Sequence, residues 1–293
     1  MSHHITRAGL AAITIFAVTL LHGSIAVAGE SQGQKSAALT ETITEYGVTD
    51  WTNGVVRARG LGFPPKESAN ALHAKTMTKR AAHSVALRNL LETVKGVRVD
   101  SKTTVRNYML ANDEITVLIS GMVEGAKVVH EQELPDGTYE VTLEMDLKGN
   151  LNKTVAPKPK DQKPPKIQGN GKVPTPVKLK YTGLVVDARG TGAQPALAPK
   201  ILNEEGQEAY SVAYVEDAKA ENGIVIYVPD LSSAEAHPRV THQPLVVKAM
   251  RATGQSKSDL VISDADAQSI HAVPDHFRFL EKAQVLVVLD RVK

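Results

Sequence analysis

The 293-residue sequence contains no cysteine, few aromatic residues and a single tryptophan, Trp51. The absence of cysteine excludes disulfides, zinc–thiolate and iron–sulfur sites, a cysteine nucleophile and a lipidated cysteine from these residues. The HExxH and GxSxG motifs and a dinucleotide-binding fingerprint are also missing from the sequence. With 42% hydrophobic and 23% charged residues, the composition is that of a globular protein that carries no recognisable catalytic motif.

The first 28 residues have the layout of a secretory signal peptide. They contain one basic residue, Arg7, and a mostly apolar run over residues 8–21 precedes the small residues at 26–28. A transmembrane anchor is the alternative interpretation, but the apolar run is short for it, because crossing a bilayer takes about 20 apolar residues. We therefore expect a signal peptide over residues 1–28, cleaved after Ala28. The mature protein is then expected in the periplasm, with or without contact to the outer membrane, and without a lipidated cysteine.

Positive charge is concentrated in one segment of the chain. Residues 148–180 contain nine lysines, six prolines and one acidic residue, Asp161, whereas residues 29–147 and 181–293 are mildly acidic. Proline and like charges favour an extended backbone, so we predict a semi-rigid linker over residues 149–177. The alternative is that this linker docks on an anionic polymer such as lipopolysaccharide or cell wall. Basic and aromatic residues are not interleaved, which argues against binding to nucleic acid.

The segment before the linker, residues 40–148, predicts a two-layer α+β domain. Residues 66–95 are rich in alanine, leucine and lysine and contain no glycine or proline, which predicts a long helix. The many alanines indicate that this helix approaches a sheet closely. Its apolar stripe is expected at Leu72, Met77, Ala81, Val85 and Leu91, with Leu90 and Val94 widening it. Strands are expected at residues 55–61, 97–108, 114–123, 126–134 and 139–147, the last two joined by a hairpin turn at residues 135–137.

Residues 178–293 predict a second small α+β domain in which strands dominate. As in the first domain, we expect an antiparallel-dominated sheet packed with helix. Ser263 and Asp266 have the spacing of a capping box, which predicts a short helix that ends near His271. The expected strands lie at residues 177–187, 200–203, 208–215, 223–228, 245–253, 259–262 and 284–289.

An acidic row on the predicted hairpin is the first candidate ligand site. Carboxylates are the ligands that Ca²⁺ prefers, but no loop with calcium-binding spacing accompanies this row. We therefore expect a solvated strand face rather than a metal site. The row consists of Glu140, Glu144 and Asp146, with Glu131 and Glu133 across the hairpin.

Two histidine pairs are the second candidate. His237 and His242 are five residues apart, as are His271 and His276, and proline interrupts both pairs. This spacing suits neither one face of a helix nor a common zinc pair. The histidines of the long helix, at positions 73 and 83, are expected at its surface or half-buried.

Three further motifs have simpler structural explanations. Gly190 and Gly192 follow a predicted strand, but no third glycine or helix follows, so we predict a turn with positive φ. Asp264 and Asp266 form a carboxylate pair that helix capping explains. Gly171-Lys172 lacks the first glycine and the Ser/Thr of a phosphate-binding loop. We therefore predict no catalytic, cofactor-binding or metal site, and no enzyme activity.

Several segments in sequence order resemble a known family. They are VVRARG at 55–60, GFPP at 62–65, MTKRAA at 77–82, LRNLLE at 87–92, GVRVDSKTTV at 96–105, Ser120-Gly121, Gly125-Ala126 and LPDGTYEV at 134–141. Residues 50–148 resemble the envelope-lipoprotein domain shared with flagellar outer-membrane-ring assembly proteins of the P and T type. The segment YTGLVVDARG at 181–190, with Pro195-Ala196-Leu197, resembles the second half of longer exported relatives.

The resemblance implies a non-catalytic role in assembling or stabilising a structure at the outer membrane, such as a flagellar ring. Expected partners are envelope proteins, among them basal-body ring components, or further copies of this chain. The family also includes surface lipoproteins of other roles, so a periplasmic module that binds cell-wall polymer through its basic linker stays as the alternative. The resemblance identifies no binding residue in this sequence. The matched Arg80, Arg88 and Asn89 are expected either to make helix–sheet contacts or to contact a partner.

Overall fold

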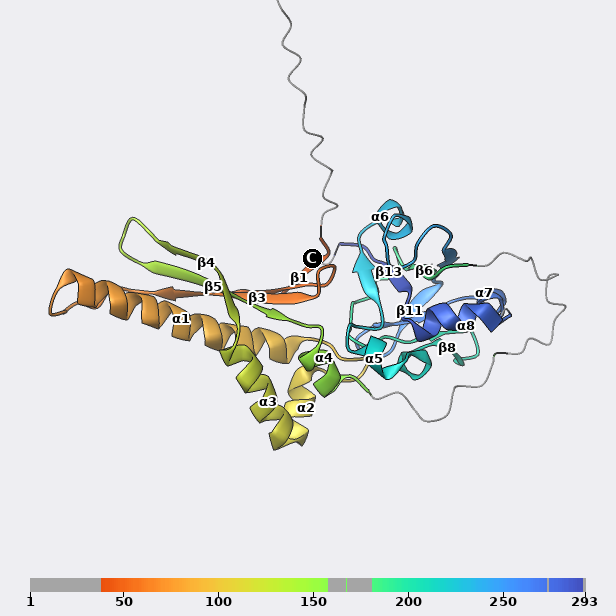
Figure 1. The fold of residues 1–293 in the computed structure, drawn as a ribbon, viewed down its shortest axis with the longest axis horizontal. Helices are drawn as coiled ribbons and strands as arrows, with labels where there is room; N and C mark the ends of the chain where they lie inside the picture. The colour runs from red at the N-terminus through yellow and green to blue at the C-terminus, as the bar shows by residue number, and fades with distance from the viewer. Residues whose placement is uncertain (1–37, 158–166, 168–180, 273, 292–293) are drawn as a thin grey trace, which may run out of the picture. The chain divides into compact units, whose positions relative to one another are not determined.

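The computed structural model describes residues 38–157, 167, 181–272 and 274–291, and all of them fall in one compact unit, Ser36–Lys293. The predicted signal peptide, residues 1–28, and most of the predicted linker, residues 158–166 and 168–180, lie outside the described residues. Figure 1 shows the mixture of helices and sheets that the α+β class predicts, and the class is confirmed.

A five-stranded antiparallel sheet forms the first half of the described chain. Its hairpin β4–β5 is the one that the turn at Pro135-Asp136-Gly137 predicts, and Gly137 has a φ of +80° there. β5 alternates between buried and half-exposed residues, as expected for a strand with one face on the core. In spatial order the strands are β1 (Thr40–Thr44), β2 (Gly47–Asp50), β3 (Val55–Gly62), β5 (Tyr139–Asp146) and β4 (Lys127–Glu133).

Helix α1 (Ala71–Gly96) lies along one face of this sheet and contacts mainly β3 and β5. The contact with β3 is unusually close. A Cβ atom on Gly60 would lie 2.2 Å from the backbone nitrogen of Ala86, and one on Gly62 would lie 2.1 Å from the carbonyl oxygen of Thr78. The alanine content therefore predicts correctly that the helix approaches a sheet, because only small residues on both elements allow this distance.

The predicted apolar stripe on α1 is wrong at Leu72 and Met77, whereas Leu90 and Val94, which were predicted to widen it, are buried. The helix buries Thr78, Ala82, Ala86, Leu90, Thr93 and Val94. The predicted Leu72 and Met77 are 76% and 45% exposed. The large apolar residues suggest one face of the helix. The two glycines of β3 instead select the face that carries the small residues of α1, because only these allow the close contact.

Two predicted strands, at residues 97–108 and 114–123, are also wrong. The chain forms helices α2 (Val105–Ala111) and α3 (Asp113–Glu124) there. Asn112 lies between them, and its side-chain oxygen accepts hydrogen bonds from the backbone nitrogens of Glu114 and Ile115, which starts α3. The β-branched residues that suggested a strand include Ile119 and Val123, which α3 buries one helical turn apart.

The second half contains a four-stranded sheet that is parallel throughout, contrary to the antiparallel-dominated sheet that was predicted. Its central strands have every or nearly every residue buried, because both faces of the sheet are covered. A short apolar segment does not reveal from the sequence alone whether its neighbouring strands are parallel or antiparallel to it. In spatial order the strands are β10 (Leu245–Lys248), β6 (Leu184–Asp187), β13 (Val285–Val288) and β9 (Ile226–Val228).

A second sheet in this half combines antiparallel and parallel pairs. The predicted helix start at Ser263 is confirmed, since Ser263 Oγ accepts a hydrogen bond from the Asp266 nitrogen at 3.1 Å and donates one to the Asp266 carboxylate. The strands in spatial order are β11 (Arg251–Thr253), β12 (Asp259–Val261), β7 (Ile201–Leu202) and β8 (Glu208–Tyr210). The helical elements are η1 (Val212–Tyr214), α5 (Asp217–Ala220), α6 (Leu231–Glu235), α7 (Asp264–His271) and α8 (Pro274–Glu281).

The start of the predicted linker is helical rather than extended. α4 (Asn150–Val155) buries Leu151 and Val155. Its Asn152 side-chain amide donates a hydrogen bond to the carbonyl oxygen of Ala220, and Lys153 forms an ion pair of 2.9 Å with Glu221. α4 thus attaches the first half of the chain to the second, while the two-domain boundaries themselves stay a prediction.

We predict that Gly60→Ala destabilises the protein by about 1–3 kcal/mol, the usual cost of overpacking. The added methyl group would lie within 2.7 Å of three backbone atoms of α1, so the helix must move away from β3. The free energy of unfolding, measured in urea, checks this. Ser84→Ala, at an exposed position of the same helix, is the control and is expected to leave stability unchanged. Equal stability of Gly60→Ala and the parent would contradict the close contact.

Candidate functional site

The structure separates the acidic row into two groups, and each group pairs with cations. Glu131 and Glu133 face α1, where Lys79 and Lys75 approach them to 2.8 and 2.6 Å. The other carboxylates belong to the opposite face of the sheet or its end. There Glu140 pairs with Arg59 at 3.7 Å, Glu144 with Arg57 at 2.7 Å and Asp146 with Lys127 at 3.8 Å. These ion pairs connect the edge strand β4 and the open sheet face to neighbouring cations. The carboxylates of the row therefore do not meet at one point where they could bind a metal ion together.

The histidine pairs do not converge either. The ring of buried His271 contacts the carbonyl oxygen of Ala209 at 2.9 Å and accepts a hydrogen bond from the Ile167 nitrogen. His276 is buried against Tyr181 and Phe279, whereas His242 is exposed. Across the described residues, no group of three or more His, Asp or Glu side chains is arranged to hold a metal ion.

The remaining candidates have structural roles. Gly190 and Gly192 adopt φ values of +77° and +69°, which confirms a turn after β6. Asp266 caps α7 together with Ser263, as described above. Asn89 donates a hydrogen bond of 2.8 Å to the carbonyl oxygen of Arg59, so it is a helix–sheet contact. Arg80 and Arg88 are exposed on α1.

A buried polar network, which we call the junction, joins the two halves of the described chain. The Glu41 carboxylate accepts hydrogen bonds from the Trp51 indole nitrogen at 2.8 Å and from the Arg98 guanidinium. Arg98 also donates to the carbonyl oxygen of Pro195 at 2.7 Å. The rings of Trp51 and Tyr227 meet edge to face, 5.8 Å apart. Buried charge is tolerated here because both members of the pair are hydrogen-bonded.

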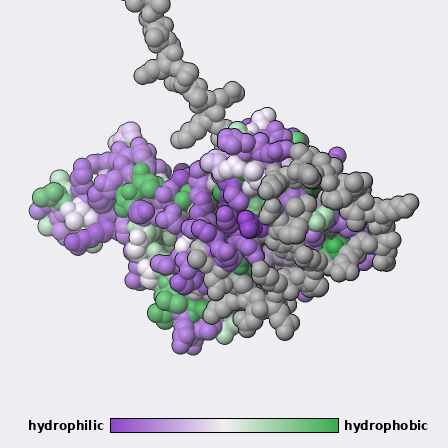
Figure 2. Space-filling model, turned by 45° about the vertical axis from the view of Figure 1, so that its right-hand side comes forward, coloured by the Kyte–Doolittle hydropathy of each residue, from purple (hydrophilic) through white to green (hydrophobic). Residues whose placement is uncertain are grey.

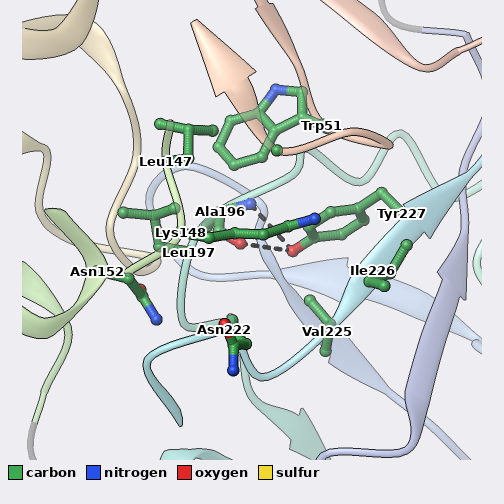
Figure 3. Close-up of a pocket in the computed structure, with 12 residues that line it drawn as sticks. Trp51, Leu147, Lys148, Asn152, Ala196, Leu197, Asn222, Val225, Ile226 and Tyr227 are labelled. Atoms are coloured by element: carbon green, nitrogen blue, oxygen red, sulfur yellow. Dashed lines mark hydrogen bonds between the residues drawn. The ribbon is translucent and has the colours of Figure 1, made fainter. Parts of the chain in front are cut away.

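Figure 3 shows the side chains around a small cavity at the junction, where the Tyr227 hydroxyl is hydrogen-bonded to the backbone of Ala196. The cavity measures about 30 Å³, room for about two water molecules. The hydrogen bonds and ring contacts around it make the junction a structural joint.

A group of basic residues lies near the same cavity. Burial lowers the pKa of the Lys148 ammonium, and the charge of Arg239 lowers it further. Burial also lowers the pKa of His237, again with contributions from Arg239 and Lys148. Arg239 donates hydrogen bonds to the carbonyl oxygens of Gly223 and Ala283. Arg239 thereby holds two loops of the second half in place, and Lys148, the first lysine of the basic segment 148–180, lines the cavity as part of the fold.

The most distinctive exposed surface is on α3. Val117 and Leu118 are 70% and 53% exposed, and Gly121 and Met122 continue the same surface by one turn. We call these four residues the α3 face. Together with Asn150, Lys153 and Thr154 of α4 they line an open groove of about 590 Å³. Figure 2 shows hydrophobic residues grouped at the lower end of the molecule, where Figure 1 places α2 and α3.

Other exposed apolar residues are more scattered. Leu110, 82% exposed, lies near the end of α2. Phe63 and Leu72 lie next to the loop that leads into α1, and Val128 and Val129 lie on the edge strand β4. Single exposed apolar residues are common in soluble proteins, whereas a contiguous apolar surface marks an interaction site. The α3 face with its groove is therefore the candidate functional site.

The α3 face was not among the predicted sites, because a strand was expected at residues 114–123. Two signals in the sequence would have found it. Ile115, Ile119 and Val123 recur every four residues, which is a helical spacing. Asn112 precedes them as a helix cap, so that Val117 and Leu118 fall on the side away from the core.

Comparisons with known proteins match the two halves separately. Residues 64–146, which include α1, α3 and the β4–β5 hairpin, match the model of the LPP20 lipoprotein family. Residues 183–291 match the model of the second domain of Treponema pallidum Tp0624. No curated protein sequence matches the chain. The first match supports the predicted envelope lipoprotein-like domain, while the link to flagellar ring proteins stays a prediction.

The part of the chain that the structure describes contains no helix with the length and hydropathy needed to cross a membrane.

We predict that Glu41→Ala destabilises the protein by about 3–5 kcal/mol, because it leaves the Arg98 charge buried without its partner. The Arg98 and Glu41 side chains are only 16% and 9% exposed. Urea unfolding measures the loss. Glu92→Ala is the matched control, since its pairs with Lys95 and Arg106 are at the surface and such pairs contribute about 0–1 kcal/mol. Similar losses for both variants would contradict a junction held by the buried pair.

Proposed function

We propose that this chain is a non-catalytic exported protein that assembles or stabilises a structure associated with the outer membrane. The observation that carries the proposal is the α3 face, an apolar surface on a body whose acidic row is engaged in ion pairs. Such a surface is suited to binding another macromolecule. The LPP20 match, which spans α3, supports a place in the cell envelope.

The paired state of the titratable groups also favours a scaffold over an enzyme. Enzymes position acids, bases and nucleophiles around a cavity that holds the substrate. Here the acidic row is neutralised by lysine and arginine, and the Glu41–Arg98 pair is used in the junction. The groove at the α3 face is lined by apolar residues with one asparagine, one threonine and one lysine, which suits a protein surface better than a reacting molecule.

A flagellar ring is the more specific form of this proposal. It is supported by the resemblance of residues 50–148 to ring-assembly proteins of the P and T type. Co-purification of the protein with basal bodies, together with loss of motility on deletion, is the outcome expected of a ring component. An envelope role without this co-purification would limit the proposal to other outer-membrane structures.

We predict that Leu118→Asp releases the protein from the envelope fraction, with at least a tenfold lower bound share, because a carboxylate in the α3 face opposes apolar contact. The measurement compares cell fractions from strains in which a C-terminally tagged copy replaces the gene. Leu72→Asp is the matched control, because Leu72 is exposed on α1 away from the α3 face. Unchanged fractionation of Leu118→Asp, with intact envelope integrity in a deletion strain, would contradict the proposal.

The alternative function is a periplasmic module that binds an anionic polymer through its basic segment. It rests on the concentration of lysine within residues 148–180. Two of these nine lysines belong to the fold, because Lys148 lines the junction cavity and Lys153 pairs with Glu221. The other seven lie within residues 158–180 and are the ones to test.

For this alternative we expect that replacing those seven lysines by glutamine abolishes salt-sensitive binding to lipopolysaccharide or isolated cell wall. Lys148 and Lys153 stay unchanged so that the junction and α4 are preserved. Sedimentation of the protein with the polymer at low and high salt measures the binding. Binding that persists in the seven-fold variant would rule out the basic segment as the docking element.

A further inference from the structure

Beyond α4, the basic segment (residues 148–180) contacts the second half of the chain at Ile167. This residue lies between α4, which ends at Val155, and β6, which begins at Leu184. Its side chain packs against the hydrophobic core, and its backbone nitrogen donates a hydrogen bond of 3.0 Å to Nδ1 of His271. One apolar and one polar contact therefore fix Ile167 on the body of the protein.

The partners of His271 determine where its ring carries a proton. His271 is the last residue of α7 and is 4% exposed. A backbone nitrogen only donates, so Nδ1, which faces Ile167, is an acceptor and carries no proton. A carbonyl oxygen only accepts, so Nε2, 2.9 Å from the Ala209 oxygen, carries the proton of the neutral ring. The contact with Ile167 therefore requires the neutral imidazole.

Acid acts on this contact directly. A proton added to the ring can bind only at Nδ1, the atom that faces the Ile167 nitrogen. Two N–H donors would then point at each other and neither would have its acceptor, which is unfavourable in a buried place. The hydrogen bond from Nε2 to Ala209 is kept, because a protonated ring still donates there. Protonation therefore displaces Ile167 rather than the histidine.

The position of His271 in α7 also favours protonation once Ile167 has left. The carboxyl end of a helix stabilises a positive charge, and the acidic residues of α7, Asp264 and Asp266, lie at its other end. Burial raises the pKa of Tyr214, whose ring lies 5.6 Å from His271, so its hydroxyl stays neutral. The other charged and titratable side chains described on the elements packed against α7 are Glu208 of β8 and His276, Arg278 and Glu281 of α8.

His276 is the second buried histidine in this region. Its Nδ1 donates to the carbonyl oxygen of Ser269 at 3.2 Å, and its Nε2 is buried without a hydrogen-bond partner among the described residues. Protonation there would add a buried N–H without an acceptor. Acid therefore acts on both histidines, and a test has to separate them.

We infer that His271 and Ile167 form an acid-sensitive latch, which holds the basic segment to the second half at neutral pH and releases it when the imidazole is protonated. An ordinary imidazole titrates near about pH 6.5. Because the closed latch requires the neutral ring, its closing equilibrium weakens by up to about tenfold for each pH unit below that value. The inference does not rest on the α3 face or on the proposed function, and its failure leaves both unchanged.

The latch lies among the lysines that give the segment its charge. Within residues 158–180, four lysines precede Ile167 and three follow it. A single hydrogen bond to a titratable group thus decides whether this charge is held to the body at its middle. The latch makes the presentation of the basic segment depend on the pH outside the cytoplasm, where we expect the protein.

Hydrogen exchange of the Ile167 amide in the full mature chain tests the latch. The chain is labelled with ¹⁵N-isoleucine, and Ile167→Val identifies the signal. We expect the amide to be protected at pH 7.5 and this protection, corrected for the intrinsic exchange rate, to fall by about tenfold or more at pH 5.0. The ¹⁵N shifts of the His271 ring should show the proton on Nε2 at pH 7.5. Equal protection at both pH values, no protection at pH 7.5, or a proton on Nδ1 at pH 7.5 would each overturn the inference.

Two substitutions separate the histidines. His271→Asn puts an amide oxygen near the position of Nδ1 and cannot be protonated, so we expect Ile167 to stay protected at pH 5.0. His276→Asn removes the other buried imidazole and should leave the loss of protection at pH 5.0 as in the parent. Loss of protection at pH 5.0 in His271→Asn, or its disappearance in His276→Asn, would refute the latch. Urea unfolding at pH 7.5 establishes that both variants are folded, and the pH profile of the parent decides the question if either is not.

His242→Gln, at an exposed position, is the matched control and is expected to behave as the parent at both pH values.

Discussion

The buried guanidinium of Arg98 connects three parts of the chain that are far apart in sequence. It pairs with Glu41 of β1, donates to the carbonyl oxygen of Pro195 in the second half, and lies over the Trp51 ring at 5.9 Å. Arg98 follows α1 directly, at the point where the chain leaves the sheet for α2 and α3. A charge buried in this way must keep its partners, because losing one leaves an uncompensated ion. The exit of the chain from α1 is therefore fixed by the same contact that joins the halves.

Backbone hydrogen bonds reinforce this joint beside Arg98. The nitrogens of Leu197 and Ala198 donate to the carbonyl oxygens of Arg98 and Val99 at 3.0 and 2.7 Å. Three residues later, Ser101 accepts a hydrogen bond from the Ser256 nitrogen, so the segment before α2 is held along its length. Because its base is fixed, α3 presents its exposed side in a defined orientation. That rigidity suits an assembly surface, since a preorganised surface loses less entropy on binding.

The parts of the fold that could be predicted from sequence are those with local signals. The α1 helix, the hairpin turn at residues 135–137 and the helix cap at Ser263 each follow from a few neighbouring residues. The parallel direction of β6, β9, β10 and β13 could not be predicted, because it depends on which distant strands meet. The junction could not be predicted either, since Glu41, Arg98 and Pro195 acquire their roles only by being brought together. Composition likewise gave no sign that Lys153 belongs to the fold rather than to a linker.

The error at α3 has a more specific cause, and it connects the folding of this segment with its proposed use. Isoleucine, threonine and valine favour strands mainly by packing against neighbours on a sheet, so their preference yields when capping and a four-residue burial pattern select a helix. Once the segment is helical, Ile119 and Val123 are buried, and Ile115 and Met122 pack partly against the core. Val117 and Leu118 are then apolar beyond what the core requires. Apolar side chains that a fold leaves exposed on a fixed helix lower the free energy of the molecule only when something else covers them.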